Sequence, residues 1–104
     1  AYRLNHEEVE QLGKLSELRR LVLYRTNFGN DGLKHLAKCP HLESLNLTSS
    51  AITDDALKDI AEFKSLKYLC LGDVQVSPEA VNTLKEQFRA RGKEIGLGYS
   101  QRKK

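Results

Sequence analysis

The sequence predicts an α/β solenoid, in which short parallel strands alternate with helices and equivalent elements stack on one another. Three observations predict it: a leucine triplet, an apolar pair and a single large apolar residue each recur every 24 residues without an insertion. The triplets are Leu18, Leu21, Leu23; Leu42, Leu45, Leu47; and Leu66, Leu69, Leu71. The pairs are Val9/Leu12, Leu33/Leu36, Leu57/Ile60 and Val81/Leu84. The single residues are Leu4, Phe28, Ile52 and Val76.

Each leucine triplet has the alternating spacing of a short strand with one buried face. Each apolar pair, at positions i and i+3, predicts a helix behind that strand. Ser77 and Pro78 are a helix-start signal, since the hydroxyl can cap the first turn and proline lacks a donor that the turn does not need. Residues 53–55 and 30–31 predict the same capping for the two preceding helices. One strand and one helix cannot bury an apolar face alone, so the units must stack into a curved slab.

A single domain is expected over residues 1–98. Residues 4–17 predict an N-terminal helical cap, residues 18–89 three full repeats, and residues 90–98 a degenerate closing strand. A basic tail is expected over residues 99–104.

The closing strand is predicted from the same 24-residue interval. Gly92 predicts the end of the last helix, because glycine readily takes the left-handed conformation that stops one. The interval then places Ile95 in the column of Leu71, with Lys93 in place of a leucine. A charged closing strand of this kind would protect the edge of the sheet from unwanted pairing.

The segment from Ile52 to Ala61, followed by Leu66, Leu69 and Leu71, resembles the leucine-rich-repeat superfamily, and within it the ribonuclease-inhibitor-like and cysteine-containing subclasses. This resemblance implies a short right-handed horseshoe with its parallel sheet on the concave face and helices on the convex face. It also implies that the concave sheet binds proteins. The family places asparagine or cysteine after each strand, where this chain has Thr26, Ser50 and Val74. Valine cannot form the family's side-chain ladder, so a less regular third turn is expected.

Composition excludes several classes of protein. The chain has 104 residues, 39% of them hydrophobic and 30% charged, and no apolar run long enough to span a membrane. Its net charge of +3 does not by itself indicate a nucleic-acid binder. Two cysteines do not form the dense disulfide framework of a small secreted domain. A cytoplasmic location is favoured by this and by the lack of a visible signal segment, although Ala1 allows the chain to be part of a longer protein.

The candidate binding residues are those that the strand alternation directs away from the core. Tyrosine and arginine are enriched at interface hot spots, and the alternative is that these are ordinary solvated strand residues. Four strands span only about 15 Å, so the face suits a peptide or small protein patch, or acts within an oligomer or longer chain. The predicted partner-binding residues are Arg20, Val22, Tyr24, Arg25, Asn46, Thr48, Tyr68, Cys70 and Asp73.

The sequence shows no pattern of catalytic or cofactor-binding residues, and a non-enzymatic protein without cofactor is expected. His35, Cys39 and His41 are metal-ligand types, but the helix should direct His35 outward while Cys39 joins the apolar column of Phe63. No metal site is therefore predicted. Cys39 and Cys70 are expected to be free thiols too far apart to bridge.

Two alternatives to protein binding at the sheet remain open. From Lys85 onward there are seven basic and two acidic residues, so the basic carboxyl-terminal end could bind nucleic acid or another anionic surface. Short terminal charge runs are more often solvated tails. The chain could also be a structural piece of a larger substrate-receptor scaffold.

Overall fold

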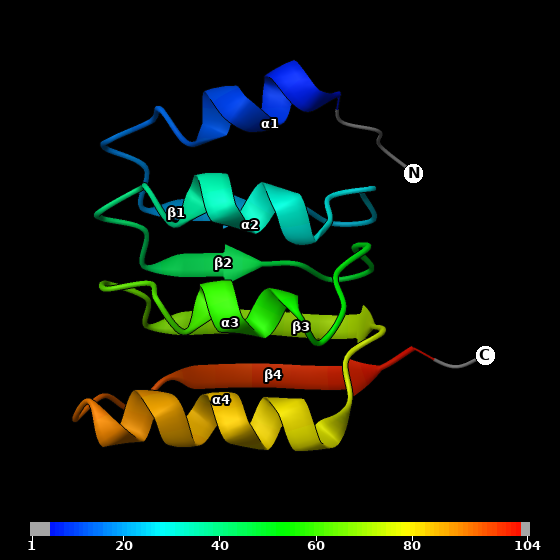
Figure 1. Ribbon diagram of the computed structural model, residues 1–104, viewed down its shortest axis with the longest axis vertical. Helices are drawn as coiled ribbons and strands as arrows, with labels where there is room; N and C mark the ends of the chain where they lie inside the picture. The colour runs from blue at the N-terminus through cyan, green and yellow to red at the C-terminus, as the bar shows by residue number, and fades with distance from the viewer. Residues whose placement is uncertain (1–4, 103–104) are drawn as a thin grey trace.

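A computed structural model of the chain describes residues 5–102 and shows four helices alternating with four strands (Figure 1). Position 4 of the predicted cap therefore lies outside the described residues. The helices are α1 (His6–Leu12), α2 (Asn30–Leu36), α3 (Ala56–Ile60) and α4 (Pro78–Ala90). The strands are β1 (Arg20–Val22), β2 (Ser44–Asn46), β3 (Tyr68–Val74) and β4 (Gly96–Gln101).

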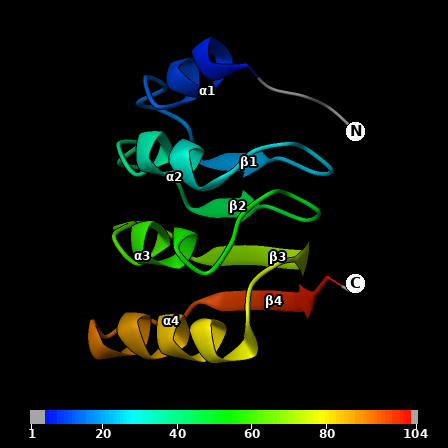
Figure 2. The same ribbon diagram turned by 45° about the vertical axis from the view of Figure 1, so that its right-hand side comes forward.

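The strands form one parallel sheet in chain order, β1-β2-β3-β4. Leu21 pairs with Leu45, and Leu45 pairs with Leu69, so the first three strands keep equivalent leucines in register. The four helices lie side by side in a second layer over one face of the sheet (Figure 2). An α/β fold with a parallel sheet is thereby confirmed, and the other face of the sheet, which we call the open face, is left uncovered by helices.

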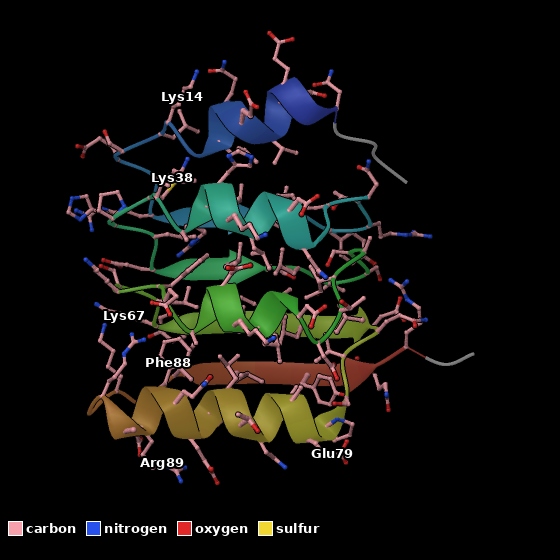
Figure 3. All side chains as sticks on the ribbon, in the orientation of Figure 1. Lys14, Lys38, Lys67, Glu79, Phe88 and Arg89 are labelled. Carbon is pink, nitrogen blue, oxygen red and sulfur yellow. The ribbon has the colours of Figure 1, made fainter. Side chains whose placement is uncertain are left out.

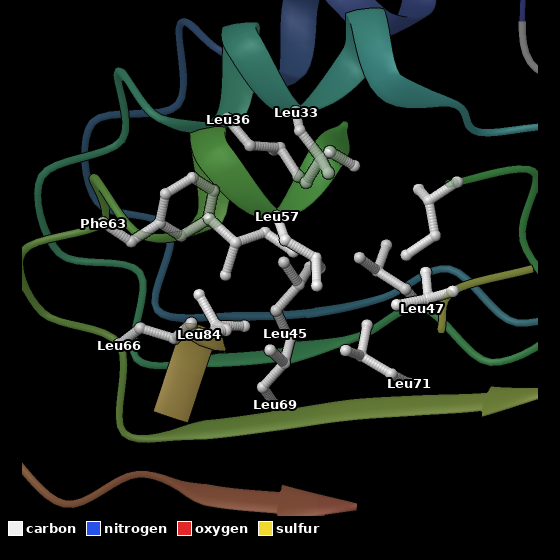
Figure 4. Packing of buried hydrophobic residues seen from close by; sticks show 14 of the residues in the cluster. Leu33, Leu36, Leu45, Leu47, Leu57, Phe63, Leu66, Leu69, Leu71 and Leu84 are labelled. Atoms are coloured by element: carbon white, nitrogen blue, oxygen red, sulfur yellow. The ribbon is translucent and has the colours of Figure 1, made fainter. Parts of the chain in front are cut away.

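The core lies between the two layers and is built from the predicted apolar columns (Figure 4). Leu45, Leu69 and Leu71 of the sheet are at most 2% exposed. The helix residues that meet them are at most 5% exposed, because the i and i+3 positions of each helix lie on its sheet-facing side. These helix residues are Leu33, Leu36, Leu57, Ile60, Val81 and Leu84.

The helix starts agree with the sequence only in part. Ser77 caps α4, accepting a hydrogen bond from the backbone N–H of Ala80, and Pro78 opens the helix as expected. The capping predicted for the two preceding helices is wrong, since neither α2 nor α3 has a side-chain cap. Asn30 and Asp54 instead form hydrogen bonds with the next unit, because the loops before successive helices lie next to each other.

These contacts between loops follow one pattern. The amide of Asn30 accepts from the backbone N–H of Thr53 at 2.9 Å and donates to its hydroxyl at 2.7 Å. One unit later, the carboxylate of Asp54 accepts from the backbone N–H and hydroxyl of Ser77 at 2.7 and 2.9 Å. The side chains at the helix starts therefore join successive units rather than ending individual helices.

The closing strand differs from the prediction. Ala90 is still in α4, and β4 begins at Gly96, so the strand lies outside most of the predicted range of 90–98. Leu97 pairs with Leu69 and Tyr99 with Leu71, so Tyr99 rather than Ile95 occupies the Leu71 column. The reason is that α4 has 13 residues against seven in α2 and five in α3, which displaces the next strand by four positions.

Two further expectations about this end are wrong. The strand β4 contains no charged residue, so its edge is not protected by charge in the way the sequence suggested. The tail predicted from position 99 is part of the fold as far as Arg102, whose backbone N–H donates to the carbonyl of Val74 at 2.8 Å. The expected stop at Gly92 is correct, with a φ of 74° just beyond the helix.

The turns after the first three strands share one backbone feature. Arg25, Ser49 and Asp73 stand at equivalent positions and have φ values of 53°, 58° and 51°. Side chains rarely adopt this left-handed conformation, so the repeated turn is imposed by the stacking of neighbouring turns. The third turn is nonetheless irregular as expected: β3 continues to Val74, and its register with β4 shifts between Leu71 and Val74.

Candidate binding face

The open face carries most of the large apolar side chains that the described residues expose. Val22, Tyr24 and Tyr68 are 57%, 56% and 63% exposed, and the only other large one among residues 5–102 is Leu15. All three follow from strand alternation, since their neighbours Leu21, Leu23 and Leu69 point to the core. Exposed aromatic and branched side chains that lie together on a rigid sheet can contribute apolar area to an interface.

The centre of the open face is polar and internally bonded. The side-chain oxygen of Asn46 accepts from both the backbone N–H and the hydroxyl of Thr48, at 3.0 and 2.6 Å. The same hydroxyl lies 3.2 Å from the sulfur of Cys70. These three predicted residues are half-buried and hold one another in place, so they form a firm floor rather than projecting contacts.

Asp73 is not available as a free contact. Its carboxylate accepts a hydrogen bond from the Ser49 hydroxyl at 2.7 Å and forms an ion pair with the Arg102 guanidinium at 3.5 Å. Its backbone N–H donates to the hydroxyl of Ser100 at 2.8 Å. Asp73 thus stabilises the turn at the end of β3. Among the predicted binding residues, some side chains project from the open face, whereas Asp73, Asn46, Thr48 and Cys70 bind or contact other residues of the chain.

Arg102 is a residue of this region that sequence reasoning did not single out. Besides its ion pair, the guanidinium donates to the carbonyls of Ser50 and Asp73 at 3.0 and 3.1 Å. It thereby connects the second turn to the third. The closing strand was predicted to end at residue 98, so the sequence held no signal for the role of Arg102 beyond its charge.

In the described part of the chain, the side chains of the two exposed arginines of the open face have no acidic partner. Arg25 lies over the ring of Tyr24, with its guanidinium carbon 6.0 Å from the ring centre. Within residues 5–102, the side chain of Arg20 has no hydrogen bond or ion pair, whereas that of the adjacent Arg19 is bound to Glu43 at 2.9 Å. The face is therefore positively charged on the side of β1.

A shallow hollow of about 280 Å³ lies on this face. Arg20, Ser44 and Tyr68 are aligned across three strands, so the small serine leaves a depression between two large side chains. Gly96 continues the same row, and a Cβ there would come within 3.0 Å of the Tyr68 ring. The absence of that Cβ lets the tyrosine ring lie against β4. The hollow is lined chiefly by Arg20, Val22, Ser44, Asn46, Tyr68 and Cys70.

A larger hollow of about 510 Å³ lies between α1 and the start of α2. Among the described residues, it is bordered by Asn5, Val9 and Phe28. It contains none of the predicted binding residues.

The remaining cysteine and histidine residues do not converge. Cys39 is buried, its thiol donates to the carbonyl of Leu12 at 3.3 Å, and burial raises the pKa of this thiol. Both Cys39 and Cys70 are free thiols. In the described part of the chain, no three histidine, cysteine, aspartate or glutamate side chains lie close enough together to hold a metal ion.

Several cations of the basic carboxyl-terminal end are used within the chain. The guanidinium of Arg91 donates to the carbonyls of Ala61 and Phe63, and the ammonium of Lys93 donates to the carbonyl of Lys64. These carbonyls belong to the segment that follows α3, so both side chains fasten the last helix to its neighbour.

Basic residues also gather where the helices end. Lys14, Lys38 and Lys67 are seen along this edge in Figure 3, and Arg89 lies at the same end of α4, opposite Glu79. Cations in the last turn of a helix and acids in the first turn complement the helix dipole, which gives Arg89 and Glu79 a structural reason. No helix within residues 5–102 has the length and apolar character needed to span a membrane.

Residues 38–61 match the family model described as Leucine Rich repeat. This match supports membership of the leucine-rich-repeat family. It covers β2 and α3, in the middle of the chain, where the leucine columns are most deeply buried. A comparison with curated proteins finds no match to the chain. Leucine-rich-repeat domains commonly mediate protein–protein interaction, and the family is generally non-enzymatic.

Proposed function

We propose that this chain is a protein-interaction module, a short leucine-rich-repeat solenoid of the ribonuclease-inhibitor-like type whose open face binds a protein or peptide. The observation that carries the proposal is the placement of Val22, Tyr24 and Tyr68. These side chains leave more than half of their surface in water on the one face of the sheet that no helix covers. Their exposure contributes nothing to the core, whereas contact with a partner would remove the apolar surface from water.

The size of the face limits the partner. The molecule measures 35 × 34 × 18 Å along its principal axes, and its sheet has four strands. A standard interface buries about 800 Å² on each partner, which approaches the whole of such a face. A peptide or a small protein patch is therefore the partner that the open face best accommodates, with Arg20 and Arg25 as its polar contacts.

The test is affinity capture of cross-linked partners from a lysate of the source cells, with three forms of the protein. The wild type is compared with Tyr24→Ala/Tyr68→Ala and with Lys58→Ala/Gln87→Ala, whose altered side chains are exposed on the helix layer. We expect the tyrosine variant to lose at least one partner that the helix variant retains. Equal recovery from all three forms would contradict binding through the open face.

A further inference from the structure

We propose that the open face binds an acidic peptide segment that places one apolar side chain in the hollow between Val22 and Tyr68, beside Arg20. The inference rests on the proposed function and names the chemistry of its partner. Three features of the structure carry it: the shape of the hollow, the imbalance of charge around it and the rigidity of its floor.

The hollow has the size and lining of a side-chain subsite. At about 280 Å³ it is at or below the lower end of the range for small-molecule pockets, which starts at about 300 Å³. Val22 and the Tyr68 ring form apolar walls, while Ser44 and Asn46 lie at the bottom. A leucine or phenylalanine side chain can cover both walls at once, which a fully polar ligand cannot do.

The charges around the hollow favour acidic residues next to that side chain. Arg20 lines it, and the Arg20 side chain has no hydrogen bond or ion pair within residues 5–102. Glu43, next to Ser44, is bound to Arg19, and the described residues that line the hollow include no carboxylate. A peptide carboxylate would therefore meet the unpaired Arg20, whereas a basic peptide would meet a cation and no carboxylate among the residues that line the hollow.

The floor is organised before binding. Thr48 is hydrogen-bonded to Asn46 and contacts Cys70, and all three lie on or just after paired strands. A rigid site loses little conformational entropy when it is occupied, so a small area can still give measurable affinity. Nucleic acid is a poorer candidate, because backbone binding needs many phosphate contacts and the described residues that line the hollow include a single cation, Arg20.

The experiment uses fluorescence anisotropy with three short labelled peptides and one labelled single-stranded oligonucleotide. In the first peptide, glutamates and serines flank one leucine. The second has alanine in place of that leucine, and the third has lysines in place of the glutamates. We expect the acidic leucine peptide to bind best, with each of the other two peptides losing about tenfold in affinity. Added salt should weaken binding of the acidic leucine peptide.

Variants then locate the site. Arg20→Glu should reduce affinity for the acidic leucine peptide by about tenfold, and Val22→Ser should abolish the preference for leucine over alanine. Lys85→Glu, a matched charge reversal at an exposed position of α4, should change neither property. Circular dichroism of each variant establishes that it remains folded.

Four outcomes overturn the inference: equal binding of all three peptides, stronger binding of the oligonucleotide, an equal effect of Arg20→Glu and Lys85→Glu, or no binding of any peptide. If the tyrosine-dependent capture described above persists in that case, the open face binds another class of partner and the proposed function stands. If the capture fails as well, both proposals are wrong.

Discussion

The middle of the sheet and its carboxyl-terminal end are built from the same apolar columns, but different contacts hold each of them in the fold. Around β2, the residues that pair between neighbouring strands are equally spaced in the sequence, as Leu21, Leu45 and Leu69 are. Leu45 and Leu47 are at most 1% exposed. At β4 the interval is longer, Leu97 and Tyr99 are only half-buried, and side chains make the connections that regular stacking makes elsewhere. A middle unit is thus stabilised from both sides, whereas the last one depends on individual polar contacts.

The largest difference is expected in the cost of removing equivalent leucines. Leu45→Ala leaves a cavity between two strands and the helix layer, and should lower the free energy of unfolding by about 3 kcal/mol. Leu97→Ala removes a side chain that is already half in water, and should cost about 1 kcal/mol. Urea denaturation followed by circular dichroism measures both. Similar losses would show that the end of the sheet is packed as firmly as its middle.

A smaller effect is expected from the contact that fastens α4 to the preceding unit. Arg91→Ala removes donors to the carbonyls of Ala61 and Phe63 and a contact with the Phe88 ring, whose centre is 4.9 Å from the guanidinium carbon. We expect a loss of about 1 kcal/mol in the free energy of unfolding. Arg89→Ala, two residues away and exposed, should change it by less than about 0.5 kcal/mol. The prediction is wrong if both variants unfold at the same urea concentration.

The smallest effect concerns alkaline pH. The Tyr99 hydroxyl donates to the carbonyl of Val76, and its pKa is raised above 10.0 by burial and then by the negative charges of Asp54 and Glu79. Because the pKa is higher in the folded state, this stabilisation is complete below about pH 10 and is lost as the pH rises through the folded-state pKa. Wild type should therefore lose stability above about pH 10 more steeply than Tyr99→Phe. Parallel curves in urea titrations at several alkaline pH values would refute this.

The apolar columns could be predicted because each depends on residues close in sequence. The alternation of residues around Leu45 predicts which side of β2 is buried, and the spacing of Leu57 and Ile60 predicts which side of α3 is buried. The same alternation correctly directed Tyr24 and Tyr68 outward. The hollow could not be predicted in this way, since it depends on Ser44 lying between residues of two other strands.

Charge was the least predictable feature. Asp54 was expected to cap its own helix and instead binds Ser77, and Asp73 was expected to project and instead binds Arg102. A carboxylate takes whichever donor the fold brings within reach, and that donor lies in another unit in both cases. The consequence for function is that the unpaired cations Arg20 and Arg25 emerge only after these pairings are known.

By itself, the sequence determined the alternation of strands and helices, the parallel order of the units and the side of each strand that faces the core. These follow from side-chain period and burial, which are local properties repeated along the chain. Only the tertiary structure decided where β4 begins, which carboxylates are neutralised and where the open face is hollow. Each of these depends on contacts between units, including the longer α4 and the row of Arg20, Ser44, Tyr68 and Gly96, which no single unit contains.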